Sequence, residues 1–174
     1  MANVPTIDQL NKFTDAEFNS FISNLFEPCP ILITPLLKLK PFTSYEDLLS
    51  KVSQVIVSLS EEGQIEIINA HPRLGAPKES LSEHSFKEQG YANAPQETPE
   101  QLAIRKELND LNDAYEKQFG FKFMIFVNGR NFQQIIPVLK ERLARNDRKA
   151  DQKSALQDFV LIANSRLNKL QGKL

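Results

Sequence analysis

Apolar residues recur every three or four positions over much of the chain, which is the spacing of one face of an α-helix. The clearest case follows Ser44, where six apolar residues share a face: Leu48, Leu49, Val52, Val55, Ile56 and Leu59. A second helix is predicted from about Glu61 to Ala70. It should end at His71, because Pro72 disfavours helical geometry in the residue before it. His71 is therefore expected at a helix exit.

Capping signals mark the starts of further helices. Thr14 is followed by Glu17 at the spacing of a capping box, so a helix should begin near Asp15. A long helix is predicted to start after Thr98, which is followed by Pro99 and by Gln101 at capping-box spacing. It should run to about Phe119 and end at Gly120. Three more helices are predicted without such a start signal, at about 31–37, 83–89 and 148–170, and Gly90 should close the second of them.

The segment from Phe121 to Val127 is apolar without helical spacing and ends at the turn pair Asn128-Gly129, so it predicts one short strand at most. Asn131 can cap a helix after this turn, with Pro137 either in the first turn or bending the helix. At least five helical patterns stand against one extended segment. The sequence therefore predicts an all-α bundle, with residues 1–174 forming a single domain.

Composition narrows the function classes. The 174 residues are 41% hydrophobic and 25% charged, as in folded globular proteins. A net charge of -1 without a polybasic run argues against nucleic acid as a partner. No apolar run approaches the roughly 20 residues that span a bilayer, and the N-terminus lacks a secretory pattern. One Cys and two His indicate no metal site, and the lack of a Gly-rich phosphate loop indicates no nucleotide site. Because a lone Cys29 cannot build a disulfide framework, we expect an intracellular, reducing compartment.

Candidate chemistry comes from three places in the chain. Ser85, Glu88 and Gln89 are three and four residues apart, so they share one face of a short helix, which is either a solvated surface or part of a site. His71 can exchange a proton near neutrality, or it can simply cap its helix. Arg166 falls in the apolar stripe of the last helix, so it needs a carboxylate, terminal carbonyls or an anionic ligand unless it snorkels to solvent.

Five segments resemble the 2-oxo-4-hydroxy-4-carboxy-5-ureidoimidazoline (OHCU) decarboxylases, which make (S)-allantoin at the end of urate oxidation. The likeness covers nearly the whole chain. The segments that carry it are Asn69-Ala70-His71-Pro72-Arg73-Leu74-Gly75, Ser85-Phe86-Lys87-Glu88-Gln89, 108–115 (LNDLNDAY), Phe119-Gly120-Phe121-Lys122-Phe123 and Ile162-Ala163-Asn164-Ser165-Arg166-Leu167.

The resemblance implies a cofactor-free carboxy-lyase, usually a homodimer, acting on an anionic ureide. His71 would be the acid/base residue, Glu88 would lie in the substrate site, and Arg166 would hold substrate anion. We expect Glu88 to orient His71 there. Other residues would line the substrate site through side chains (Pro72, Ser85, Gln89) or through main-chain groups (Phe123, Met124, Ile125, Phe126, Val127). Loss of carbon dioxide leaves an electron pair that delocalises onto the neighbouring imine or carbonyl system, so the site need only stabilise charge and deliver one proton.

Three departures from the family pattern bear on the pocket. Tyr91 stands in a stretch that is usually rich in Ala and Gly, Lys122 stands where Pro is frequent, and Asn128 where a basic residue is frequent. A non-catalytic binding module and a decarboxylase of a related ureide therefore remain alternatives. The C-terminal Gly172-Lys173-Leu174 resembles a peroxisomal signal except at its first residue, so we expect peroxisome or cytoplasm.

Overall fold

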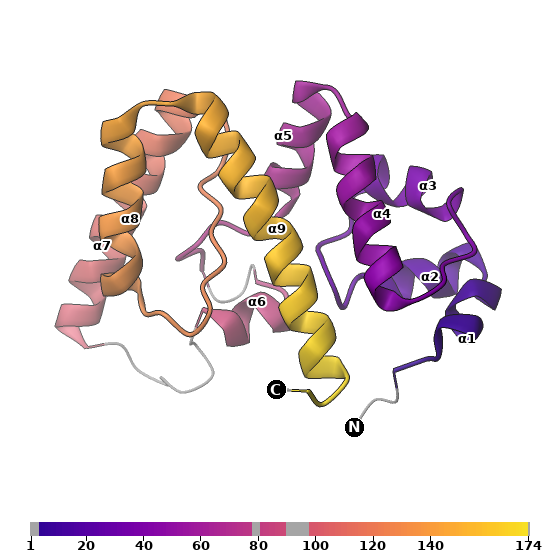
Figure 1. Ribbon diagram of the computed structural model, residues 1–174. Coiled ribbons are helices and arrows are strands. Elements are labelled where there is room, and N and C mark those ends of the chain that lie inside the picture. Colours follow the sequence, from indigo (N-terminus) through magenta and orange to yellow (C-terminus); the bar gives the residue numbers. More distant parts are fainter. Residues whose placement is uncertain (1–3, 78–80, 90–97, 174) are drawn as a thin grey trace. The chain divides into compact units, whose positions relative to one another are not determined.

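The computed structural model describes residues 4–77, 81–89 and 98–173 (Figure 1). Over these ranges the regular structure is helical throughout, without a strand, which confirms the predicted all-α class. The chain divides into two compact units. Met1–His71 and Leu156–Leu174 form the first unit, and Pro72–Ala155 forms the second. That residues 1–174 behave as a single domain stays a prediction.

Among the described residues, the first unit contains five helices and the C-terminal part of a sixth. They are α1 (Ile7–Lys12), α2 (Asp15–Ile22), α3 (Pro30–Leu37), α4 (Tyr45–Ser58), α5 (Glu61–Ala70) and α9 (Arg148–Leu170). Helix α3 packs against α4 and α5. The capping box at Thr14 is present, as predicted. Helix α1 was not predicted, although Thr6 and Gln9 form the same kind of box at its start.

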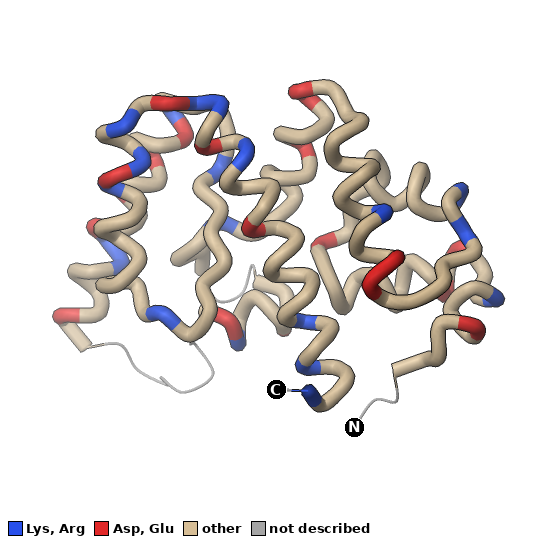
Figure 2. Tube along the Cα trace, viewed as in Figure 1, with Lys and Arg blue, Asp and Glu red and all other residues tan. Residues whose placement is uncertain are grey.

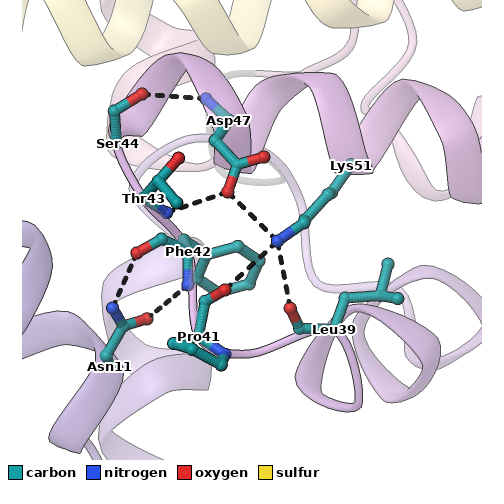
Figure 3. Close-up of polar contacts among 8 residues, drawn as sticks. All are labelled: Asn11, Leu39, Pro41, Phe42, Thr43, Ser44, Asp47 and Lys51. Carbon is teal, nitrogen blue, oxygen red and sulfur yellow. Dashed lines mark hydrogen bonds and ion pairs between the residues drawn. The ribbon is translucent and has the colours of Figure 1, made fainter.

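The segment between α3 and α4 contains Pro41, and several of its backbone groups form hydrogen bonds with side chains rather than with other backbone groups (Figure 3). The amide of Asn11 donates to the carbonyl of Phe42 at 2.8 Å, and its oxygen accepts from the amide of Phe42 at 2.8 Å. Lys51 Nζ donates to the carbonyls of Leu39 and Pro41, each at 3.2 Å. These bonds satisfy backbone groups that no helix pairs, so the segment takes a defined path into α4.

The second unit contains α6 (Glu83–Glu88), α7 (Pro99–Phe119), α8 (Phe132–Arg145) and the start of α9. Helices α7 and α8 pack side by side and run in the same direction (Figure 1). Contacts at three levels show this direction: Glu100 with Gln133 near the two starts, Glu107 with Lys140, and Gln118 with the Leu143 carbonyl near the two ends. Acidic and basic residues are interspersed along both helices (Figure 2).

The segment 121–127 returns the chain to the start of α8, as two parallel helices require (Figure 1). Seven extended residues span about 23 Å, close to the roughly 21 Å of a helix with the 14 residues of α8, whereas a helical segment would span under half of that. The segment has no strand partner among the described residues, consistent with the prediction of one strand at most.

The turn and cap after this segment form as predicted. Asn128 and Gly129 both adopt positive φ, at 48° and 75°, and Asn131 caps α8 in a reciprocal box with Gln134. Pro137 lies inside α8, five residues beyond its start at Phe132, so the first-turn placement was wrong. Its ring removes one donor from the second turn of the helix.

Candidate functional site

His71 is the C-cap of α5, as the sequence predicted. Its backbone amide donates to the carbonyl of Ile68 at 3.2 Å, and its backbone is extended, at φ -72° and ψ 141°. The side chain is half-buried, with ring Nδ1 shielded from solvent. The partial negative charge of a helix C-terminus favours a protonated imidazole, so this position suits a proton-exchanging group.

Arg166 is 2% exposed and lies on α9 within the first unit. Its Nη1 is 3.7 Å from Oε1 of Glu27, in the connection between α2 and α3. Of the partners that the sequence left open, a protein carboxylate is therefore present. Glu27 was missed because it stands between Phe26 and Pro28 outside any helical pattern, and no spacing rule connects it with a residue on the last helix.

The loop after His71 is bonded to α7 within the second unit. Asn112, fully buried, donates to the carbonyl of Leu74 at 2.9 Å. Arg73 forms ion pairs with Asp113 and, at 3.1 Å, with Glu116. The segment 108–115, which carried part of the resemblance, thus fixes the backbone of the loop that begins at Pro72.

Gly75 shows how closely that loop approaches α7. Its φ is +78°, and a Cβ atom added there would lie 2.9 Å from Cδ2 of Leu108. Both observations favour glycine. Residues with a side chain rarely adopt this φ, and a Cβ atom would come too close to Leu108. The Leu74-Gly75 pair of the motif therefore has a backbone role.

The three polar residues of α6 do not form a solvated face. Ser85 is 2% exposed, and Glu88 and Gln89 are half-buried. Gln89 is the C-cap of α6, and its Oε1 accepts from the amide of Gly75 at 2.8 Å. Its Nε2 donates to the carbonyl of Arg73 at 3.4 Å. Gln89 therefore joins α6 to the loop after Pro72, in addition to the substrate role that the resemblance implies.

The segment 123–127 is buried at its start: Phe123, Met124 and Ile125 are 2%, 3% and 7% exposed. Arginine side chains bond its carbonyls. Arg142 donates to Met124, and Arg130 donates to Phe126 and Val127. Within the described ranges, no group accepts a hydrogen bond from the amides of Phe123, Met124 or Ile125. Buried amides nearly always have an acceptor, and these three are donors that the oxygens of a ligand can accept from.

The predicted site residues thus occupy defined positions inside their own units. His71 and Arg166 belong to the first unit, while Pro72, Ser85, Glu88, Gln89 and Phe123 to Val127 belong to the second. The convergence of His71, Glu88 and Arg166 on one cavity stays a prediction. Lys122 is half-buried and Asn128 lies in the exposed turn, whereas Gly90 and Tyr91 lie outside the described residues.

Over the described ranges, no group of three or more His, Cys, Asp or Glu side chains is arranged to hold a metal ion. In the same ranges, no helix combines the length and apolar character needed to cross a membrane.

Comparison with known sequences identifies one family. The sequence profile described as OHCU decarboxylase matches residues 11–168. The chain is 27% identical over 165 residues to the 2-oxo-4-hydroxy-4-carboxy-5-ureidoimidazoline decarboxylase of Halalkalicoccus jeotgali, covering 95% of this chain and 91% of that protein. The protein with the same description from Amia calva is 29% identical over 162 residues, with 91% and 90% covered.

Longer relatives match as well. The chain is 29% identical over 164 residues to a uric acid degradation bifunctional protein of Bacillus sp. (strain TB-90), covering 94% of this chain. The chain spans about a third of that relative's length, at 32%.

Two crystal structures share the fold. An (S)-allantoin synthase superposes with a TM-score of 0.69 at 22% identity, covering 95% of this chain and 54% of that one. An OHCU decarboxylase crystallised in the presence of (S)-allantoin superposes with a TM-score of 0.67 at 23% identity, covering 91% and 98%.

Proposed function

Because the chain belongs to the OHCU decarboxylase family, we propose that it converts 2-oxo-4-hydroxy-4-carboxy-5-ureidoimidazoline to (S)-allantoin without a cofactor, as a step of urate degradation. The structural observation that carries this proposal is the row of buried amides at Phe123, Met124 and Ile125. A ureide presents several carbonyl oxygens, and backbone amides are the donors that such oxygens accept from.

The reaction needs charge stabilisation and one proton. The bond between the ring carbon and the carboxylate breaks, and its electron pair stays on the ring as carbon dioxide leaves. Delocalisation over the adjacent imine or carbonyl system stabilises that pair until a proton reaches the carbon. His71 is the proposed proton donor, because imidazole exchanges protons near neutral pH. Delivery from one side would yield a single enantiomer.

Arg166 is the proposed partner of the substrate's anionic group. Its guanidinium is buried, and Nη1 lies 3.7 Å from Oε1 of Glu27. A guanidinium shielded from water interacts more strongly with a carboxylate than one at the surface. Glu88 is proposed to orient His71, and Ser85, Gln89 and Pro72 to line the substrate site.

Assembly and location belong to the same proposal. The protein is proposed to act as a homodimer in the peroxisome or the cytoplasm. Light scattering coupled to size-exclusion chromatography would measure the mass in solution, and a mass of one chain would exclude the dimer. Imaging of a fluorescent fusion with and without Gly172-Lys173-Leu174 would decide the compartment.

The deciding experiment feeds freshly generated substrate to the protein and follows circular dichroism. Spontaneous decay yields racemic allantoin, so enzymatic turnover is recognised by a signal from one enantiomer that rises faster than decay alone. Absence of acceleration would reject the proposed activity, and binding of (S)-allantoin without turnover would favour a binding module.

A further inference from the structure

The segment 123–127 has no strand partner within the described residues, so its backbone conformation depends on side chains. Donors that recognise a small ligand need positions accurate to a fraction of an ångström. The question is therefore which side chains fix the amides that the proposed function assigns to the ureide.

Arg142 contacts the start of this segment in two ways. Its Nη1 donates to the carbonyl of Met124 at 3.1 Å, and its guanidinium carbon lies 5.2 Å from the centre of the Phe123 ring. A cation above an aromatic face and a charged hydrogen bond are each attractive, and both are stronger away from water. One side chain on α8 thus restrains two consecutive residues of the segment.

Asp151 restrains Arg142 in turn. This carboxylate is fully buried in the first turn of α9, where the helix dipole favours negative charge. Its Oδ1 is 3.8 Å from Nε of Arg142 and 2.9 Å from Nη2 of Arg145. Burial raises the pKa of the Asp151 carboxyl, while the two arginines act in the opposite direction.

Aromatic packing completes the support. The Tyr115 ring meets the Phe123 ring edge-on, with centroids 5.3 Å apart, and the Phe121 ring at 5.9 Å. The Phe123 ring therefore packs against both Arg142 and Tyr115. The Arg142–Asp151 pair is the polar part of this enclosure and the part that reaches the backbone.

From these contacts we infer that the Arg142–Asp151 pair is a positioning device for substrate recognition: it holds the main chain at Phe123, Met124 and Ile125 so that their amides meet the oxygens of the ureide. Arg142 is a positioning residue, because it acts through the segment. The inference rests on the proposed function, and it extends recognition to residues outside the motifs that carry the family resemblance.

Arg142→Lys keeps the charge but loses the planar fork that reaches Met124 and Asp151 together. We expect KM for the ureide to rise about tenfold, as for loss of a charged hydrogen bond, with kcat within about threefold. Asp151→Asn should raise KM in the same direction, and the double variant should be little worse than Arg142→Lys alone, because the two residues act as one unit.

Arg145→Gln is the matched control. Arg145 bonds the same oxygen of Asp151, but its side chain is 42% exposed and no contact joins it to the segment in the described structure. Its KM should equal that of the wild type. An unchanged KM in Arg142→Lys, or an equal rise in Arg145→Gln, would overturn the inference.

A second measurement separates this inference from the proposed function. Relaxation dispersion of the ligand-free, ¹⁵N-labelled protein reports motion on the microsecond to millisecond scale without any activity. The amides of Phe123 to Val127 should show exchange in Arg142→Lys and none in Arg145→Gln. If the wild type fails to decarboxylate the ureide, the proposed function falls, and absence of exchange in Arg142→Lys would reject the positioning role by itself.

Discussion

At the scale of single residues, the structure separates groups suited to chemistry from groups that support the backbone. His71 ends a helix with a half-buried ring, which suits proton exchange. Asn112 and Gln89 instead form hydrogen bonds with the backbone of the loop after Pro72. The sequence marked His71 by its ionisable ring at a helix exit and Gln89 by its spacing from Ser85, and neither signal reports what a side chain bonds.

Replacing His71 tests the proposed acid/base residue. His71→Ala should lower kcat/KM by about 10²- to 10⁴-fold, the usual contribution of general acid–base catalysis, and should leave the thermal midpoint nearly unchanged. Stereoselective formation of allantoin, followed by circular dichroism, measures the rate. A variant as fast as the wild type would remove His71 from the mechanism.

Asn112 tests the support of the loop after Pro72. Asn112→Ala should lower the free energy of unfolding by about 1–3 kcal/mol, because the buried carbonyl of Leu74 loses its donor. Urea unfolding measures the change. Asn19→Ala is the control, since Asn19 is exposed on a helix and should shift stability far less. Equal effects in the two variants would contradict the role assigned to Asn112.

At the scale of elements, helix boundaries followed from local signals, whereas the connections did not. The caps at Thr14, Thr98 and Asn131 and the stop at Gly120 lie where local chemistry predicts. The parallel course of α7 and α8 was not predictable in this way. It depends on whether the seven residues 121–127, six of them apolar, take an extended or a helical conformation, and only packing against the rest of the unit decides that.

Two glycines with nearly the same φ allow the cost of a close contact between elements to be measured. Gly120 ends α7 at φ +80° with nothing near a built Cβ atom, whereas Gly75 at φ +78° would place one 2.9 Å from Leu108. Gly120→Ala should cost about 1 kcal/mol from the left-handed backbone alone. Gly75→Ala should cost clearly more, and chemical unfolding would measure both. Equal losses would show that the Leu108 contact is relieved without cost.

At the scale of the whole molecule, ionised carboxyl groups at helix starts should make stability depend on pH. Hydrogen bonds from backbone amides lower the pKa values of Glu17, Glu46 and Asp47 below their ordinary 4.5, 4.5 and 3.8. For a lowered pKa, the stabilisation is complete above the ordinary value and is lost as pH falls through the lowered one. The free energy of unfolding contributed by these groups should therefore decrease on acidification below about pH 4.5.

Urea unfolding at neutral pH and in mild acid would measure this dependence. The double variant Glu17→Gln, Asp47→Asn should show a flatter profile over the same range. An identical slope in the variant and the wild type would show that these carboxyl groups do not contribute to it.

The sequence by itself determined the helices, their caps and the residue types available for chemistry, because these depend on interactions within three or four positions. Tertiary structure decided the partners: Glu27 for Arg166, the loop backbone for Gln89 and Asn112, and Arg142 for the amide-bearing segment. Such pairings join residues that are up to 139 positions apart, as 166 − 27 gives for the first of them. Only the packing of helices brings groups so distant along the chain within bonding range.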